Sequence, residues 1–209
     1  MKLEVCVDDV AGLAAAVAGG ADRIELCAAL SEGGLTPSVG FMDLAAGCGV
    51  PVRAMIRPRG GDFNFSEREL NVMCTDIAAV RAAGLEGVVL GVSDADGRLA
   101  LDPLRRLVAA ANGMRLTMHR VIDGVPDQIE AVIQARDLGF DCVLSSGGAA
   151  SAEDGCAMLA MMCAVQGITV MPGAGISAAN AARIATETGA AWMHGSFKDG
   201  VAAVRAALL

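Results

Sequence analysis

The amino-acid sequence predicts one α/β domain over residues 1–209, folded as a (β/α)8 TIM-type barrel with short loops. Eight short apolar runs rich in β-branched residues alternate with helical stretches, and no linker or insertion interrupts them. Hydrophobic residues make up 54% of the chain and charged residues 19%, so one sizeable core can form. An open doubly wound sheet is the alternative, but such a sheet normally has fewer strands.

The predicted strands follow one another along the whole chain. They are expected at Leu3–Val7, Arg23–Cys27, Val52–Ile56, Gly87–Leu90, Arg115–His119, Asp141–Leu144, Thr169–Met171 and Ala191–His194. Because a helical pattern follows each run, the strands are expected to be parallel. The chain is short for this fold, so the last helix, around 201–209, should be brief.

Helix starts are indicated by residues whose side-chain oxygen can accept a hydrogen bond from the first turn. They are expected at Thr36-Pro37, Ser66, Asp102-Pro103, Ser151 and Ser177. Ser66 and Ser151 are each followed three residues later by a carboxylate, the spacing of a capping box.

The even-numbered strands share a local pattern. Each follows a glycine, which ends the preceding helix, and a two-residue connection; these glycines are Gly20, Gly84, Gly139 and Gly189. The pattern recurs every two β/α units, as expected of a barrel in which alternate strands occupy equivalent environments.

Charge and cysteine usage limit the partners. A net charge of −8 argues against nucleic acid or an anionic membrane, so a metal ion or a small anionic molecule is expected. No apolar run is long enough to span a membrane, and a cytoplasmic location is expected. The seven scattered cysteines are expected to be free thiols. A homo-oligomer remains open.

The chemistry of such barrels lies at the C-terminal ends of the strands. The predicted strands bring charged residues there, and we expect a catalytic or binding group made of Glu4, Glu25, Arg57, His119, Arg120 and His194. Histidine beside carboxylates suits proton transfer, and arginine suits an anion. Each residue also has a structural alternative. The carboxylates could pair with a barrel arginine, Arg57 could lie in a solvated loop, and the histidines could belong to the core.

A second group of small residues follows the last two strands. Gly173 and Gly175, with Gly195 and Ser196, could present backbone amides to an anion, as phosphate sites of many barrels do. The alternative is that these glycines form tight turns.

Cys6 and Cys27 are the candidate metal ligands. Side chains alternate along a strand, so Cys6 shares a face with Glu4, and Cys27 shares a face with Glu25. Thiols are ligands that suit Cu(I), and the two cysteines could bind copper together. The alternative, which we favour slightly for the isolated protein, is that both are packed, reduced thiols.

Several blocks of the sequence resemble the CutC family, and the resemblance extends over essentially the whole chain. The blocks are Leu3–Asp8, Gly19–Cys27, Leu30–Ser38, Met55–Phe63 and His119-Arg120. The resemblance implies a cytoplasmic barrel named for copper homeostasis, with copper bound through cysteines, of which Cys6 and Cys27 lie in the blocks. Three segments depart from the family pattern: Val121-Ile122 replaces an aromatic-containing pair, Ala174 replaces a glycine, and Phe197-Lys198 replaces an arginine-containing end.

Two classes of function therefore remain open. One is a copper-homeostasis protein without turnover, as the resemblance implies. The other is an enzyme with lyase- or isomerase-like acid–base chemistry on a small anionic or sugar-derived substrate, as the residues at the strand ends indicate. A copper carrier needs converging thiols, whereas the predicted site is richer in Glu, Arg and His.

Overall fold

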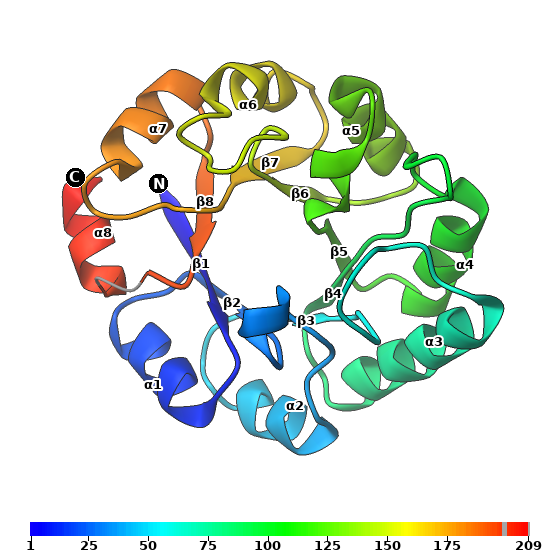
Figure 1. Ribbon diagram of the computed structural model, residues 1–209. Coiled ribbons are helices and arrows are strands. Elements are labelled where there is room, and N and C mark those ends of the chain that lie inside the picture. Colours follow the sequence, from blue (N-terminus) through cyan, green and yellow to red (C-terminus); the bar gives the residue numbers. More distant parts are fainter. Residues whose placement is uncertain (198–199, 209) are drawn as a thin grey trace.

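The computed structural model describes residues 1–197 and 200–208 and has the predicted (β/α)8 barrel (Figure 1). The strands are β1 (Lys2–Val7), β2 (Arg23–Leu26), β3 (Val52–Met55), β4 (Gly87–Leu90), β5 (Arg115–Met118), β6 (Cys142–Ser145), β7 (Thr169–Pro172) and β8 (Trp192–Gly195). The α-helices are α1 (Val10–Ala18), α2 (Val39–Ala46), α3 (Glu67–Ala82), α4 (Leu101–Ala111), α5 (Gln128–Asp137), α6 (Cys156–Cys163), α7 (Ala181–Thr188) and α8 (Val201–Ala207). Two short 3-10 helices, η1 (Leu30–Glu32) and η2 (Arg120–Gly124), follow β2 and β5.

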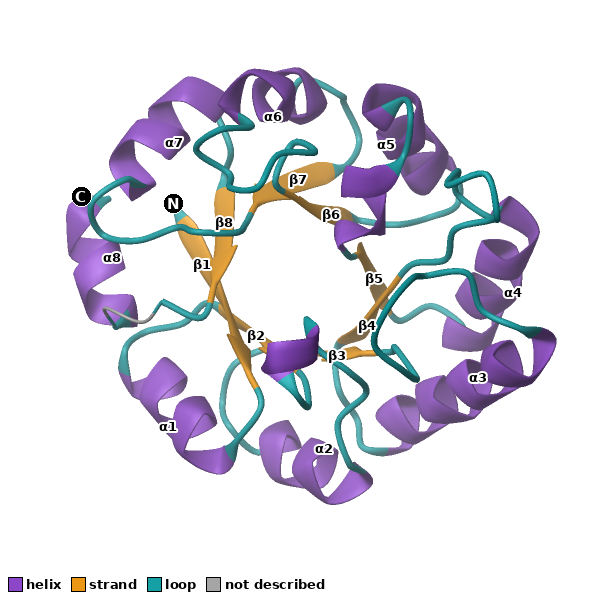
Figure 2. Cartoon of the chain, in the orientation of Figure 1, coloured by secondary structure: helices purple, strands orange, loops and turns teal. Residues whose placement is uncertain are grey.

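The strands form a ring with the helices outside it (Figure 2). Parallel pairing runs in the order β7-β6-β5-β4-β3-β2-β1-β8, and β7 lies beside β8, so the barrel is nearly closed. In the register, Glu4 of β1 lies opposite both Arg23 of β2 and His194 of β8, and Cys6 lies opposite Glu25. These pairings bring polar side chains of β1, β2 and β8 to neighbouring levels of the barrel interior, or lumen.

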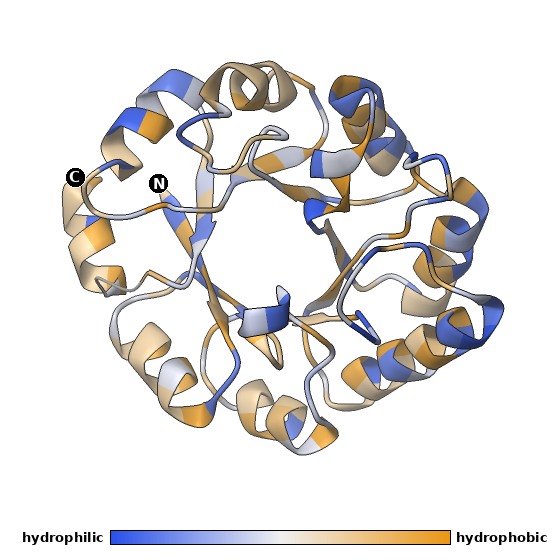
Figure 3. Cartoon of the chain, viewed as in Figure 1, coloured by the Kyte–Doolittle hydropathy of each residue, from blue (hydrophilic) through white to orange (hydrophobic). Residues whose placement is uncertain are grey.

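The main apolar core lies between the ring and the helices. Along β1, the fully or nearly fully buried Leu3, Val5 and Val7 belong to this core and alternate with Glu4 and Cys6. Polar and apolar residues alternate on α3, α4 and α7, with the polar positions mainly at the periphery, whereas α1 and α6 are apolar throughout (Figure 3). No helix in the described ranges is both long enough and apolar enough to cross a bilayer.

The predicted glycine pattern before the even-numbered strands is confirmed. Gly20, Gly84, Gly139 and Gly189 have φ values of 86°, 76°, 98° and 66°, the left-handed region that glycine tolerates best. The predicted capping box at Ser66 is also present, because its side chain and that of Glu69 each accept a backbone N–H from the other residue.

Four helices begin later or earlier than predicted. Ser38, and not Thr36, caps α2, and Ala100 precedes α4, so Pro103 lies inside the first turn. Ser151 accepts the N–H of Asp154 in a separate turn, and α6 begins only after Gly155. Before α7, the side chain of Asn180 accepts the N–H of Ser177. It organises the preceding turn, and the helix starts after it.

Candidate functional site

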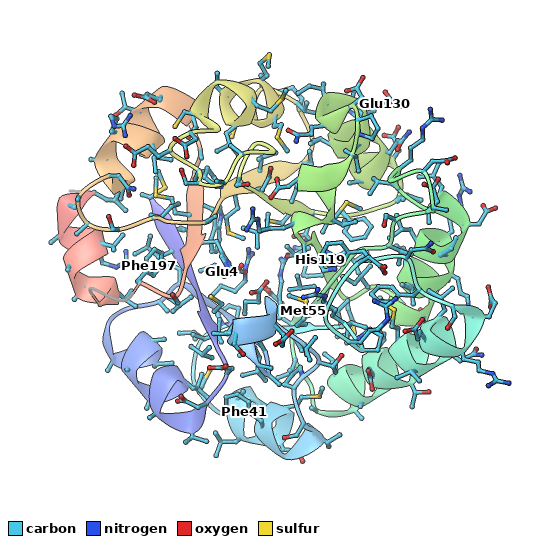
Figure 4. The ribbon with its side chains drawn as sticks, in the orientation of Figure 1. Glu4, Phe41, Met55, His119, Glu130 and Phe197 are labelled. Carbon is cyan, nitrogen blue, oxygen red and sulfur yellow. The ribbon has the colours of Figure 1, made fainter. Side chains whose placement is uncertain are left out.

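A cavity of about 800 Å³ opens at the C-terminal ends of the strands, where the sequence placed the site. Among its lining residues are the predicted Cys6, Glu25, Arg57, His119, Arg120 and His194. Glu4 does not line the cavity but contacts His194. Figure 4 shows Glu4 and His119 inside the ring of strands, in contrast to Phe41 and Glu130, which lie with the helices.

Glu4 is fully buried and binds two basic side chains. One carboxylate oxygen forms an ion pair with the Arg23 Nε, and the other lies 2.8 Å from the His194 Nδ1. Burial alone would raise the pKa of Glu4, but the hydrogen bond with His194 and the charge of Arg23 lower it to about 2. The predicted alternative for this carboxylate, a pair with a barrel arginine, is thus present together with a histidine contact.

Glu25 and His194 form the next level of the lumen. The His194 Nε2 lies 3.6 Å from Glu25 Oε2, and the other carboxylate oxygen, Oε1, is buried without a hydrogen-bond partner among the described residues. Burial raises the pKa of Glu25. Burial opposes protonation of His194, but the negative charge of Glu25 and the contact with Cys6 raise its pKa well above the ordinary value. The pair can therefore hold and exchange a proton at the floor of the cavity.

Cys6 joins this pair in a three-residue group. One donor atom from each of Cys6, Glu25 and His194 lies within 4.8 Å of the other two. Cys27 is outside that group: its side chain is fully buried beside Met55, with the Sγ 3.6 Å from the Glu25 carboxylate. Burial and the charge of Glu25 raise the pKa of the Cys27 thiol well above its ordinary value. The structure therefore places Cys6 in one group with Glu25 and His194, whereas Cys27 contacts Glu25 but lies outside that group.

Arg57 lies on the cavity wall and is held by backbone carbonyls. Its Nη1 donates to Glu32 O at 2.8 Å and to Gly34 O at 3.3 Å, and its Nη2 donates to Gly61 O at 2.8 Å. The guanidinium also lies over the Phe63 ring, 4.8 Å from its centroid. It is a buried side chain that fastens two loops over the mouth of the barrel, and not a solvated loop residue.

His119 is buried on the same wall. Its Nδ1 accepts the N–H of Val121 at 3.1 Å and caps η2, and its ring packs against Phe63 with centroids 4.5 Å apart. Burial and the charge of Arg57 lower the pKa of His119 to about 3. His119 is thus a neutral imidazole, in contrast to His194.

The Arg120 side chain is partly exposed and forms an ion pair and a hydrogen bond. Its Nε pairs with Asp123 at 2.7 Å, and its Nη2 donates to the Ser146 hydroxyl at 2.8 Å. Asp123 also accepts from the Ser145 hydroxyl and the Ser146 N–H, at 2.5 and 3.0 Å. Arg120 and Asp123 therefore fix the loop after β6, and the Arg120 side chain reaches the cavity as part of that network.

The glycines predicted to bind an anion at the ends of β7 and β8 differ in their positions relative to the cavity. Gly175, Gly195 and Ser196 line the cavity, but the Gly173 N–H donates to Ser145 O at 2.9 Å. The prediction that Gly173 offers its amide to an anion is therefore wrong. A Cβ at Gly173 would lie 2.5 Å from Leu144 Cδ1, so close packing explains the glycine. Lys198, which departs from the family pattern, lies outside the described residues.

Two contacts of the site were missing from the sequence prediction. Arg23 was assigned to a strand without a role, although its position two residues before Glu25 places both on one face. Phe63 is named from the sequence only as the end of the Met55–Phe63 block, although its ring contacts both Arg57 and His119. Strand alternation could have indicated Arg23, whereas no local signal indicates the contacts of Phe63.

The fold and the residues of the lumen define a (β/α)8 barrel with a polar, partly ionised site at the C-terminal ends of its strands. The CutC family model matches residues 1–199, and the chain belongs to the CutC family. CutC family proteins of Caulobacter vibrioides and Agrobacterium fabrum are 52% and 58% identical to it over 197 and 178 residues. These matches cover 93% and 84% of this chain, and 80% and 71% of the relatives.

One solved structure agrees with this assignment, and a second shares the fold alone. A Streptococcus agalactiae protein, named as a copper homeostasis protein CutC, is 29% identical with a TM-score of 0.89, and the match covers 94% of this chain and 99% of that one. A deoxyribose phosphate aldolase from Aeropyrum pernix, 16% identical with a TM-score of 0.71, shares the fold over 100% of this chain and 91% of its own. The family resemblance of the sequence is thereby confirmed.

Proposed function

We propose that this CutC-family protein binds a copper ion, as its cargo, through Cys6, Glu25 and His194. The observation that carries the proposal is the convergence of one donor atom from each residue within 4.8 Å, at the floor of the cavity. Thiolate and imidazole are ligands that copper takes readily, and a carboxylate can complete the set. The family to which the chain belongs is the one named for copper homeostasis in its Streptococcus agalactiae relative.

Glu4 supports this assignment through its contact with the second ring nitrogen of His194. A metal-binding histidine usually donates its other ring N–H to a carboxylate, which fixes the tautomer and the ring orientation. The His194 Nδ1 lies 2.8 Å from Glu4 Oε1, so the Nε2 remains for the metal. Cys27 is a poor ligand by comparison, because its buried thiol resists deprotonation and only the thiolate binds strongly.

An anaerobic Cu(I) titration against a competing chelator tests the proposal. We expect wild type to bind stoichiometrically, and Cys6→Ser and His194→Gln each to lose affinity by about 10-fold or more. Cys27→Ser is the matched control, because it removes a neighbouring thiol and should retain the affinity. Equal weak binding by wild type and Cys6→Ser would overturn the proposal, as would a loss seen only in Cys27→Ser.

Acid–base catalysis on a small anionic or sugar-derived substrate is the second candidate function. It is favoured by the raised pKa values of Glu25 and His194 at the floor of a cavity of about 800 Å³, a volume that suits a small molecule. In this proposal Glu25 transfers the proton in a lyase- or isomerase-like reaction. Chelator-treated protein would be incubated in D2O with hydroxy acids, keto acids and sugar phosphates, and C–H exchange followed by proton NMR. Exchange that Glu25→Gln abolishes would support catalysis, and no exchange with any compound would count against it.

A further inference from the structure

Two buried N–H donors on one wall of the cavity have no acceptor in the described part of the chain. They are the Nε of Arg57 and the Nε2 of His119, whose residues are 6% and 3% exposed. Buried donors are nearly always paired, because an unpaired one loses its hydrogen bonds to water without replacement. Two on the same wall point to a ligand that accepts from both.

The proton on the His119 Nε2 follows from the contacts of the ring. The Nδ1 accepts the Val121 N–H, so it carries no proton, and a neutral imidazole must then carry its proton on Nε2. The ring packs closely against Gly91, because a Cβ there would lie 2.7 Å from the His119 Cε1. The absence of a side chain at Gly91 thus allows the imidazole to sit against the end of β4.

Arg57 carries a positive charge that no carboxylate of the described residues balances within 4.0 Å. Its Nη atoms donate to three backbone carbonyls, which carry no net charge, and the Glu32 carboxylate acts on the guanidinium only from beyond 4.0 Å. Arg59, two residues later, shows the contrast: it forms ion pairs with Glu69 and Asp62 at 2.6 and 3.0 Å. A buried guanidinium without a directly paired carboxylate favours an anionic ligand.

Phe63 contacts the side chains of both donor residues. The His119 ring packs on it at 4.5 Å between centroids, and the Arg57 guanidinium lies 4.8 Å from its centroid. The aromatic ring contacts both side chains, and a low local dielectric strengthens a hydrogen bond to a ligand. These three residues form one subsite, which we call the Arg57–His119 subsite.

We propose that the Arg57–His119 subsite binds the carboxylate of a small organic acid, through the Arg57 Nε–H and the His119 Nε2–H. One cation and one neutral donor match a singly charged group better than a phosphate dianion, which Glu25 in the same cavity would further disfavour. The rest of the molecule would extend toward Glu25 and His194. The subsite uses neither Cys6 nor a metal, so it stands independently of the proposed copper binding.

Thermal unfolding of chelator-treated protein with acetate, glycolate and pyruvate tests the subsite, with chloride as the ionic-strength control and inorganic phosphate as the competing class. We expect at least one carboxylate to raise Tm saturably, because it binds only the folded state. The chain has two histidines, so selective nitrogen-15 labelling resolves both rings. The same carboxylate should shift the Nε2–H resonance of His119. A response to phosphate alone, or to no anion, would overturn the proposal.

Two pairs of variants locate the response. His119→Asn keeps an oxygen near the position of Nδ1 and so keeps the cap of η2, but it removes the Nε2 donor, whereas His119→Gln retains a donor near Nε2. We expect His119→Asn and Arg57→Met to weaken carboxylate binding by about 10-fold or more, and His119→Gln to weaken it much less.

Arg105→Met is the matched control for Arg57→Met, because Arg105 pairs with Asp102 on the exposed face of α4. Wild-type affinity in His119→Asn and Arg57→Met would overturn the subsite. Cys6→Ser, measured in parallel, should keep carboxylate binding and lose copper, so the failure of one proposal is distinguishable from the failure of the other.

Discussion

Protonation of His119 is predicted to destabilise the folded protein in mild acid. The residue is 3% exposed, and its Nδ1 already accepts the Val121 N–H, so a proton there would displace that bond. Burial and the charge of Arg57 lower the pKa of His119 to about 3 from an ordinary value of 6.5. The unfolded chain takes up this proton near the ordinary value, and the folded chain does so only at far lower pH.

The sign and size of the effect follow from proton linkage. Between the two pKa values the unfolded state binds one more proton, so the free energy of unfolding rises by about 1.4 kcal/mol per pH unit. The contribution of neutral His119 to the free energy of unfolding is complete above the pKa of His119 in the unfolded chain. It is lost as pH falls from 6.5 towards 3. From about pH 7.5 to about pH 5.0 the loss is about 2 kcal/mol, which lowers Tm by roughly 4 to 8 °C for a chain of this size.

Urea unfolding of wild type and His119→Gln over this pH range measures the effect. Buffers without carboxylates avoid ligands of the Arg57–His119 subsite. Glu25, with its raised pKa, contributes the opposite sign, since its stabilisation is lost as pH rises above its ordinary value, but it is present in both proteins. The difference between the two curves should therefore widen by about 2 kcal/mol towards higher pH. Parallel curves would refute the neutral, buried imidazole.

The remaining stability predictions concern turns and caps. Ala174 has a φ of 79°, so Ala174→Gly should relieve backbone strain and raise the free energy of unfolding by about 0.5 to 1 kcal/mol, measured by urea unfolding. Ser38 accepts the Phe41 N–H at the start of α2, so Ser38→Ala should cost about 1 kcal/mol in the same assay. Ser177→Ala should cost only about 0.5 kcal/mol or less, because Asn180, and not Ser177, directly precedes α7. Equal losses at Ser38 and Ser177 would contradict the observed helix starts.

The strands were predictable because a barrel strand has a strong local pattern. Each predicted run agrees with the observed strand to within one residue at either end, since β-branched residues and a following helix mark the limits. The helix starts at Thr36 and Ser177 were not predictable in this way. Any nearby hydroxyl or amide can cap a helix, and the choice depends on the loop that precedes it.

The residue types of the site were predictable from the sequence, but the level at which each side chain lies inside the barrel was not. Strand alternation places Glu4 and Cys6 on one face, yet it does not say that Glu4 lies a level below the cavity, between Arg23 and His194. It equally placed Cys27 on the lumen face, where the structure packs it against Met55 and Val89. The carbonyl contacts of Arg57 depend on loops whose course no short-range pattern fixes.

The position of Glu4 beneath the proposed metal ligands leads to a last prediction. Glu4 cannot touch a metal held by Cys6, Glu25 and His194, because its Oε1 is bound to the opposite ring nitrogen of His194. Its effect on copper must therefore pass through the orientation and basicity of that imidazole, and Glu4→Gln should weaken copper binding by roughly 10- to 100-fold without removing a ligand. The same substitution leaves Arg23 without its carboxylate, so stability will fall as well.

A variant at the level of Arg23 separates these two effects. The Cys142 Sγ lies 3.7 Å from the Arg23 Nη2, and Cys142→Ala disturbs the packing around that guanidinium while leaving the Glu4–His194 contact in place. We expect it to lower stability but to keep wild-type affinity in the chelator competition, at a temperature where both variants are folded. If Cys142→Ala weakened copper binding as much as Glu4→Gln, the loss would reflect repacking of the lumen, and Glu4 would have no specific role in positioning His194.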